Sequence, residues 1–483
     1  MLKHLKLIMV TLMILLSMPA ITALDLPTKN INGETYHYYV VKQKETVYSL
    51  CKRFGISKDE MVKYNPAVAD GLKTGMTLYF PAENNVGSEV DIEVETMATP
   101  AVSTQVAQPT VPTITPQTVN DVQPATISTS NDKLSIVVML PFMLNERKPS
   151  QNALKYTEFY KGILLAANEQ KSNGQPITIY AYDTADSLDR VKNILTYPEL
   201  KSADIIIAPS DNRQYVVITE FAKEHGNYVL NAFSANDKTY TRNSQILHAN
   251  IPRDMMYAKA FEYLCNTYND YTFVFLISEG GKNDKGEFAI ELQATLGKHN
   301  IKYSEILYAG ELENKHLTKL KKGGKYLFIP LTSSGSEFRK IAPQIIAMQE
   351  SASNKNDIRL FGFPEWVTFK GENLNNLHRI NATIYSRFFN DNNAPSSRAI
   401  SEAFNQWFGI QMIESYPIQG ILGYDLGTLL IKSLRNNSTF GKQYDGVQSA
   451  FEFISASETG GYVNNSLYII NYNADGSIDR KLY

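Results

Sequence analysis

The sequence predicts an α/β protein: a small βααβ module, a disordered linker, and a large domain of two lobes whose parallel sheets are flanked by helices. Three observations support this prediction. A strand–helix–helix–strand pattern fills residues 36–82, residues 83–132 contain no Lys or Arg, and strands alternate with helices through residues 133–483. Such alternation is typical of parallel sheets. The number of strands exceeds one sheet of ordinary width, which favours two lobes.

Residues 1–23 have the pattern of a signal peptide. A basic start, Lys3 to Lys6, precedes the apolar stretch Leu7 to Met18, and small residues surround a cleavage point after Ala23. The apolar stretch is short for a membrane span. We therefore expect export and removal of this segment, with retention as an anchor as the alternative. No cysteine directly follows the cleavage point, which disfavours a lipid anchor.

The composition excludes some classes of function. The chain has 47 Lys and Arg against 49 Asp and Glu, and no basic block is interleaved with aromatic residues. Nucleic acid is therefore not an expected partner. The two cysteines, Cys51 and Cys265, fall in different predicted domains. We interpret them as buried apolar thiols rather than as a disulfide framework.

The module at 36–82 begins and ends with a strand. Strands are predicted at Tyr38 to Val41 and Met76 to Phe80, and two helices lie between them, the first ending at Gly55 and the second broken at Asn65-Pro66. So short a domain needs a compact core. Apolar side chains at helical spacing supply it: Val47, Leu50, Cys51, Met61 and Val62.

The segments YVVKQKETVYSLCKRFGISKDEMVKYNP and GLKTGMTLYFP resemble a LysM domain and cover the whole module. The resemblance implies binding of N-acetylglucosamine-containing glycans, chiefly peptidoglycan, in a groove between two loops. The implied contacts are Lys44, Glu45, Thr46 and Val47 in the first loop, and Gly71, Leu72 and Lys73 in the second. Thr46 could instead serve only as a helix cap.

Residues 83–132 are predicted to be a disordered tether. Their repeated prolines, threonines and serines forbid a packed core. As a flexible coil this segment would reach on the order of 40 Å. It would let the large domain range around a wall-bound anchor.

The large domain is predicted to contain strands at 134–140, 177–182, 205–208, 228–230, 273–277, 303–307, 326–329 and 359–363. Helices are predicted at 156–170, 254–268, 289–296 and 337–349, with an enlarged loop at 143–157. A hairpin is expected at 467–482, because Asn473 to Gly476 is a turn signal between two apolar runs.

The stretch Asp204 to Asp237 has the features of a ligand site. A buried strand ends at Pro209, and Ser210 and Asp211 follow where a helix should begin. A second strand leads into the polar turn around Ser234. Open α/β sheets bind ligands at such strand ends.

The order of the segments IVVMLPF, EFYKGILLAANE, YAYDTADS, LFGFPEW and GYDLGTLLIKSL resembles the type I periplasmic binding-protein fold, in its branched-chain amino-acid receptor branch. The resemblance implies a hinged, two-lobed cleft. It implies that hydroxyls and helix starts of one lobe take up a ligand carboxylate, and that an acid of the other lobe meets its ammonium group. The positions that match are Ser210, Ala232, Ser234, Asn236, Thr332, Ser333 and, for the acid, Glu365. Ser210 and Ser234 could instead be helix caps or turn residues.

The chain lacks the common catalytic motifs. It has no His-x-His or HExxH zinc motif and no Walker A or GxGxxG loop. We expect no metal, no cofactor and no enzymatic activity. The hypothesis is a bacterial envelope protein, periplasmic and bound to peptidoglycan, that captures a small amino-acid-like solute. The alternatives are a protein-interaction module that regulates wall synthesis, as in lipoprotein activators of peptidoglycan synthases, and a wall hydrolase.

Overall fold

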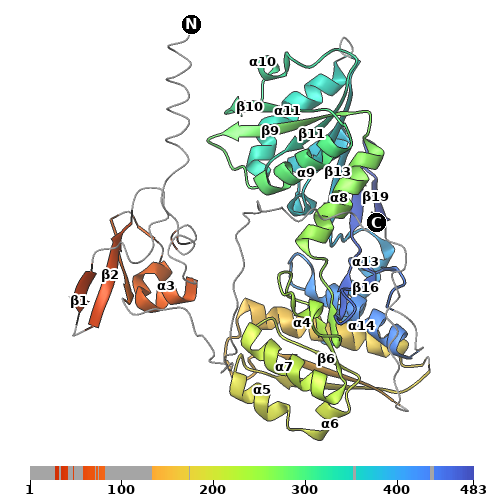
Figure 1. The fold of residues 1–483 in the computed structure, drawn as a ribbon. Coiled ribbons are helices and arrows are strands. Elements are labelled where there is room, and N and C mark those ends of the chain that lie inside the picture. The colour runs from red at the N-terminus through yellow and green to blue at the C-terminus, as the bar shows by residue number, and fades with distance from the viewer. Residues whose placement is uncertain are drawn as a thin grey trace, which may run out of the picture. The chain divides into compact units, whose positions relative to one another are not determined.

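The computed structural model describes residues 28–31, 34–41, 47, 50, 58–70, 72–73, 75–81 and 133–483, the last range without 173, 352–354 and 436–439. The chain divides into two compact units, residues 1–114 and 115–483 (Figure 1). The predicted signal peptide and the whole of the predicted linker lie outside the described residues, as does Cys51. The predicted domain boundaries therefore stay predictions.

The first unit contains an antiparallel sheet with the order β1-β2-β3. Its strands are β1 (Thr28–Ile31), β2 (Glu34–Val40) and β3 (Thr77–Pro81), and β2 pairs with β3 through Tyr38 opposite Tyr79. The helix α3 (Lys58–Tyr64) and the 3₁₀ turn η2 (Pro66–Asp70) follow β2 in the chain. The predicted strands and second helix are present. The sequence did not predict β1, which adds a hairpin to β2.

Asn65 joins the end of α3 to β3. Its side-chain amide donates to the carbonyls of Met61 (3.1 Å) and Tyr79 (3.0 Å), and its Oδ1 accepts from the Tyr79 amide at 2.7 Å. Asn65 is buried, so these bonds replace water that the side chain has lost. The residues of the small core pack around this link: Tyr39, Val41, Leu50, Met61, Val68, Leu78 and Phe80.

The second unit has two lobes, each built on a seven-stranded sheet. The first lobe's sheet has the order β16-β17-β8-β7-β6-β4-β5, and all its neighbouring pairs except β16–β17 are parallel. Its strands are β4 (Leu134–Leu140), β5 (Ile177–Asp183), β6 (Ile205–Ile207), β7 (Tyr228–Asn231), β8 (Ile246–His248), β16 (Phe453–Ser455) and β17 (Tyr462–Asn464). Its helices are α4 (Gln151–Gln170), α5 (Leu188–Ile194), α6 (Pro198–Lys201), α7 (Asn212–His225) and α14 (Gln419–Arg435).

The second lobe's sheet has the order β10-β9-β11-β12-β13-β18-β19, in which the first five strands are parallel. The strands are β9 (Thr272–Glu279), β10 (Tyr303–Ala309), β11 (Lys325–Pro330), β12 (Asp357–Gly362), β13 (Ala382–Ser386), β18 (Tyr468–Tyr472) and β19 (Ile478–Leu482). The flanking helices are α8 (Arg253–Thr267), α9 (Gly286–Lys298), α10 (Asn314–Leu317), α11 (Gly335–Glu350) and α12 (Glu372–Ile380). The predicted C-terminal hairpin is β18–β19, antiparallel to β13. These two sheets confirm the predicted two-lobed α/β fold.

The chain passes between the lobes after β8, after β13 and again between β17 and β18. Asn464 ties two of these passages together. Its amide nitrogen donates to the carbonyls of Ala249 (3.1 Å) and Ala450 (2.9 Å), and its Oδ1 accepts from the Ser466 amide at 3.0 Å. A buried side chain therefore joins these two passages.

The helices α4 and α14 touch through their backbones (Figure 1). A Cβ on Gly162 would lie 2.0 Å from the Gly420 carbonyl oxygen, and one on Gly423 would lie 1.9 Å from the Phe159 carbonyl oxygen. Both distances are far inside van der Waals contact. Glycine is therefore required where these helices cross.

Asp425 of α14 secures the loop that precedes β15 (Ala450–Phe451). Its buried carboxylate accepts hydrogen bonds from the backbone amides of Val447 (2.7 Å), Gln448 (2.9 Å) and Ser449 (3.0 Å). Burial raises the pKa of Asp425 to about 6, against the opposing effect of these donors. The same loop meets the second passage between the lobes, where the Phe389 amide donates to the Gln448 carbonyl.

One predicted boundary is wrong for a local reason. The helix α4 begins at Gln151 rather than at Tyr156, because Ser150 is its N-cap and accepts a hydrogen bond from the Ala153 amide at 3.2 Å. The loop after β4 is therefore shorter than the predicted 143–157. Buried Asp183 holds it by accepting from the amides of Met143 and Leu144, each at 3.0 Å.

Candidate functional site

The first lobe has a cavity where its strand order reverses. β4 lies between β5 and β6, so the loops that follow β4 and β6 run to opposite faces of the sheet. A crevice forms at the carboxyl ends of such strands. Here a cavity of about 350 Å³ is lined by Ser150, Tyr156, Asp186, Ser210 and Asp211, among others. This edge of the first lobe is called the first rim.

Ser210 lines the cavity and is not the helix cap. The N-cap of α7 is Asp211, whose Oδ1 accepts from the Gln214 amide at 3.1 Å. Ser210 is exposed, and its hydroxyl lies 2.9 Å from that of Tyr156 on α4. Asp211 thus satisfies the helix start and leaves the Ser210 hydroxyl at the cavity wall.

A second cavity of about 350 Å³ shares Pro209 and Ser210 with the first. Ser234, Asn236 and Tyr215 line it. Burial raises the pKa of the Tyr215 hydroxyl and the nearby Asn231 side chain opposes this, but no hydrogen bond of normal geometry reaches the hydroxyl among the described residues. A buried hydroxyl without a partner is rare in native proteins, and here it faces a cavity that could hold one.

Two of the other predicted residues have structural contacts. Ser234 forms a turn, since its hydroxyl accepts from the Asp237 amide at 3.1 Å and its own amide donates to the Asn231 Oδ1 at 3.1 Å. Ala232 is buried in the lobe core, and its carbonyl accepts from the Asn250 side chain at 3.2 Å. Ser234 and Asn236 therefore lie at the cavity, while Ala232 lies beneath it.

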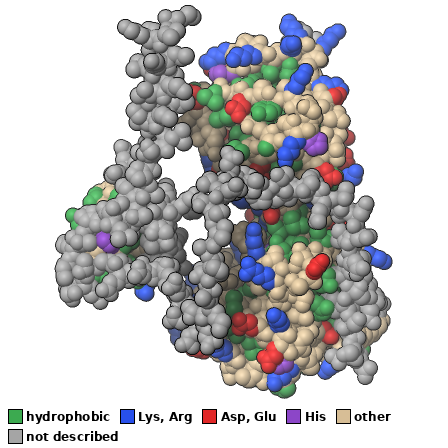
Figure 2. Space-filling view, in the orientation of Figure 1, with side chains coloured by type: hydrophobic (Ala, Val, Ile, Leu, Met, Phe, Trp, Pro, Cys, Tyr) green, Lys and Arg blue, Asp and Glu red, His purple; other side chains and the backbone are tan. Residues whose placement is uncertain are grey.

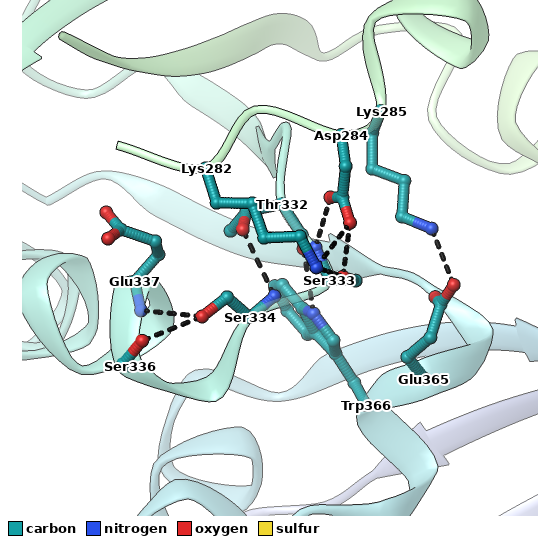
Figure 3. A network of polar contacts seen from close by, with 10 residues as sticks. All are labelled: Lys282, Asp284, Lys285, Thr332, Ser333, Ser334, Ser336, Glu337, Glu365 and Trp366. Carbon is teal, nitrogen blue, oxygen red and sulfur yellow. Dashed lines mark hydrogen bonds and ion pairs between the residues drawn. The ribbon is translucent and has the colours of Figure 1, made fainter. Parts of the chain in front are cut away.

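The second lobe presents an equivalent edge, formed by the loops after β9, β11 and β12 and called the second rim. Figure 3 shows that its polar side chains pair with one another. The Ser333 amide and hydroxyl donate to the Asp284 carboxylate at 2.8 and 2.5 Å, and Lys282 lies 2.9 Å from both residues. These contacts lower the pKa of Asp284 despite the cost of its burial.

Glu365 is also paired within the second rim. Its Oε1 lies 2.7 Å from the Lys285 ammonium (Figure 3). That ammonium is 5.0 Å from the centre of the Phe363 ring. The Glu365 side chain is 52% exposed and that of Lys285 is 14% exposed. Lys285 therefore occupies the position that the resemblance assigns to a ligand ammonium group.

Thr332 is buried below this rim. Its carbonyl accepts from the Trp366 indole at 2.9 Å, and its hydroxyl accepts from the Ser334 amide at 3.1 Å. Trp366 is fully buried in the core of the lobe. Both residues hold the second rim in place.

The helix starts at both rims are capped by the protein itself. Ser150, Asp211 and Ser334 each accept from the third amide of their helix, in α4, α7 and α11. An uncapped helix start would favour an anion. One amide of each helix start is therefore engaged already, and at α7 the cap is a carboxylate.

Several residues at the site were not predicted. Tyr156, Tyr215 and Lys285 contribute to the rims, yet the first two lie on helices and the third pairs with a residue 80 positions away. Of these three residues, only Tyr156 could have been found from the sequence, because its hydroxyl lies at helical spacing from the buried face of the helix. No sequence pattern indicates that Lys285 pairs with Glu365.

The predicted glycan contacts are described only in part. Val47 and Leu72 pack against the core of the first unit, and Lys73 is exposed. Lys44, Glu45, Thr46 and Gly71 lie outside the described residues. The glycan-binding role of these residues stays a prediction.

The described residues do not form a metal site or a reactive cysteine site. Among the described residues, no group of His, Cys, Asp and Glu could hold a metal ion. Cys265 is a buried free thiol in the second lobe, and burial raises its pKa, which disfavours a nucleophilic thiolate. No helix in the described part of the chain is long and apolar enough to cross a membrane.

Comparison with known families confirms the LysM resemblance. Residues 39–81 match the family model of the LysM domain. The chain therefore contains a LysM domain, a class of module associated with peptidoglycan. No curated protein matched the chain.

Solved structures similar to the chain include periplasmic binding proteins. A branched-chain amino acid ABC transporter protein from Rhodospirillum rubrum has 11% identity and a TM-score of 0.49, covering 72% of this chain and 100% of its own. A periplasmic ligand-binding protein from Burkholderia xenovorans has 11% identity and a TM-score of 0.44, with coverage of 72% and 94%. Full-length LpoA from Haemophilus influenzae has 15% identity and a TM-score of 0.44, with coverage of 75% and 60%. Likeness at this level does not extend to a ligand.

Proposed function

We propose that the protein attaches to peptidoglycan through its LysM domain and binds a small polar solute between the two lobes of its large domain. The two cavities that meet at Ser210 carry this proposal. They lie where the strand order reverses, the usual ligand position of an open α/β sheet. The unpartnered hydroxyl of Tyr215 supports it, because a bound solute could supply the missing hydrogen bond.

An amino-acid-like solute would bring an ammonium group to the second rim. There it would compete with Lys285 for Glu365. Ion pairs with an exposed partner contribute only about 0–1 kcal/mol. Replacing the Lys285 ammonium by that of the solute therefore costs little free energy if the solute makes other contacts. Glu365 remains our candidate for this role.

The proposal places the protein in the cell envelope. The LysM domain supports a location at the peptidoglycan. The role proposed is binding rather than catalysis. On the face drawn in Figure 2, basic and acidic side chains are interspersed over the described surface, in keeping with a partner other than nucleic acid.

One observation favours a second candidate function. The second rim neutralises its own charges through the Lys285–Glu365 and Lys282–Asp284 pairs. A rim that needs no solute charge suits a domain that has become a protein-interaction module in wall synthesis. In that case the cleft would remain empty.

Thermal unfolding of the whole exported chain tests solute binding. A ligand that binds only the folded state at a hundredfold excess over its Kd adds about 2.7 kcal/mol of stability. We expect a rise in Tm with at least one member of a panel of amino acids, short wall peptides and aminosugars. The absence of any shift, combined with recovery of an envelope protein by crosslinking, would favour the second candidate.

Sedimentation with purified peptidoglycan tests the anchor. The variant Asn65→Asp loses both amide donor bonds and buries a carboxylate, which disrupts the LysM core but leaves the large domain unchanged. We expect the wild-type chain to sediment with the wall and the variant to remain in solution. Equal sedimentation of the two proteins would refute LysM anchoring.

A further inference from the structure

Arg387 is a partly buried cation of the second lobe that has no ion pair among the described residues. It directly follows β13, at the same end of the parallel strands as the loops of the second rim. Its Nε is buried without a hydrogen-bond partner, and within the described part of the chain its guanidinium forms no ion pair. Burial lowers the pKa of Arg387, the sign of a charge that is poorly compensated.

Both lysines of the second rim have partners, and Lys238 at the second cavity is exposed, so its charge is solvated. Lys282 pairs with Asp284 at 2.9 Å, and Lys285 pairs with Glu365 at 2.7 Å. Glu365 raises the pKa of Tyr385 and of Tyr416 through its charge, and Arg387 lowers both. Glu365 forms its ion pair with Lys285 and is not within ion-pair distance of Arg387. The chain thus leaves one guanidinium unneutralised in a place where desolvation makes that costly.

Arg387 also lies near the first lobe. It acts electrostatically on His248, the last residue of β8, and so does Asp237 of the second cavity. His248 is fully buried, and neither ring nitrogen has a partner among the described residues. Burial lowers the pKa of His248 to about 4, so the ring is neutral and does not compete for an anion. Asp237 is occupied by the Thr239 hydroxyl at 2.5 Å.

We propose that Arg387 is the anion-binding residue of the cleft and that the solute carries a carboxylate which this guanidinium binds. This inference rests on the proposed solute-binding function and names the class of solute. It moves the carboxylate away from the helix starts, where Ser150, Asp211 and Ser334 already cap the amides. Arginine matches a carboxylate with two parallel hydrogen bonds, which lysine cannot do.

Two sources of such a solute share this chemistry, free amino acids and acidic aminosugars of the wall. Matched probes separate them because each pair differs at the carboxylate. L-leucine is compared with L-leucinamide, and N-acetylmuramic acid is compared with N-acetylglucosamine. The LysM domain is identical in every variant, so any sugar bound there cancels in the comparison.

The test measures binding by calorimetry and Tm for the full chain and the variants Arg387→Met and Arg387→Lys. Arg379→Met is the control, since Arg379 lies on α12, is 54% exposed and pairs with Glu350. We expect one acid to bind the wild-type chain better than its uncharged partner. Arg387→Met should weaken that acid about ten- to a hundredfold, Arg387→Lys should weaken it less, and the control should not change it.

A second readout needs no ligand. Removing an unpaired, largely buried charge should raise the Tm of the empty Arg387→Met protein by about 2 °C or more. Binding without preference for the acid, or a preference that survives in Arg387→Met, overturns the inference and leaves solute binding intact. Absence of binding by all four probes overturns the inference, while the wider solute panel decides the proposed function separately.

Discussion

The two lobes are built alike, but their rims are equipped differently. Each has a parallel sheet whose strand ends carry short polar loops. At the first rim, Ser210 and Tyr215 face cavities; the Ser210 hydroxyl bonds only to Tyr156, and no hydrogen bond of normal geometry reaches the Tyr215 hydroxyl in the described part of the chain. At the second rim, Ser333 and Glu365 are bonded to residues of the neighbouring loop (Figure 3).

This difference shows that the position of a residue in a fold does not determine whether it is free to bind. Ser210 and Glu365 are equally well placed at strand ends. The loop Lys282–Lys285 brings two ammonium groups to the second rim, and these satisfy its acids. An open rim beside a closed one predicts that, of the two rims, the first contributes more to solute affinity. Four experiments can break or sharpen this comparison.

The largest effect is expected from Gly423→Ala in the first lobe. Alanine favours a helix by about 1 kcal/mol over glycine, but its Cβ would lie 1.9 Å from the Phe159 carbonyl oxygen. The clash should dominate and cost about 3 kcal/mol. Urea unfolding followed by circular dichroism measures the loss.

The chain carries its own reporters for this test. Its two tryptophans are Trp366 in the core of the second lobe and Trp407 on α13 (Pro395–Phe408), which packs on α4. In the Gly423→Ala protein with Trp407→Phe, Trp366 emission should change at higher urea than the circular dichroism signal. The reason is that the clash lies in the first lobe, whereas Trp366 reports only on the second. The control Gly297→Ala, in an uncrowded part of α9, should be neutral or slightly stabilising. A Gly423→Ala protein as stable as wild type contradicts the close-packed crossing.

The next effect concerns pH and Asp425. Its pKa is raised to about 6 in the folded protein, above the ordinary value of 3.8, so the folded state binds the proton more tightly. This contribution is complete below pH 4 and is lost as pH rises through 6. About two pKa units correspond to about 3 kcal/mol.

We therefore expect the free energy of unfolding of the wild type to fall relative to that of Asp425→Asn between pH 4 and pH 7. Urea unfolding of both proteins at several pH values measures the difference. The comparison of slopes removes any constant cost of the substitution. Parallel profiles would show that the three backbone amides hold the carboxylate charged at no net cost.

A smaller effect is expected from Ser210→Ala at the first rim. Removing a hydroxyl that lines both cavities should weaken the solute about tenfold, or about 1.4 kcal/mol. The Tm should not change, because Asp211 caps α7. The matched variant on the other lobe is Ser333→Ala, which should leave solute affinity unchanged. Equal losses in the two variants would break the comparison between the rims.

The smallest effect on stability is expected from Lys285→Ala. The pair with Glu365 is exposed on one side, so its loss should cost less than about 1 kcal/mol. Glu365 would become free, and a solute with an ammonium group, such as L-leucine, should bind about threefold more tightly. The control is Lys325→Ala, which removes an exposed pair with Asp270 elsewhere. Unchanged affinity in Lys285→Ala would mean that Glu365 does not contact the solute.

Much of the fold could be predicted because its signals are local. The apolar run Leu134–Leu140 is too short for a helix and becomes β4 at the predicted residues. The turn signal at Asn473 to Gly476 sets the hairpin of β18 and β19. The strands missed in the large domain include β8, β16 and β17, each three residues long, and β13, which is five residues long. β17 pairs with β8 and β18 pairs with β13, and both partners lie far away in the sequence.

The site was less predictable because its contacts are not local. Ser210 and Asp211 are both good N-cap residues, and nothing in their order says which one the helix uses. The ion pair of Lys285 and Glu365 joins residues 80 positions apart. Arg387 lacks an ion-pair partner because of which residues the fold places around it. Those residues are distant in the sequence, so no sequence pattern indicates this.

The three passages between the lobes have a consequence for the order in which the protein can form. The first-lobe sheet needs β17, and the second-lobe sheet needs β18. Neither sheet can close before residues 462–472 have left the ribosome, or the translocon if the chain is exported. The two sheets must then be completed almost together. Until that point each sheet keeps an unpaired, exposed edge strand. A chain cut before that point would leave two incomplete sheets rather than one finished lobe.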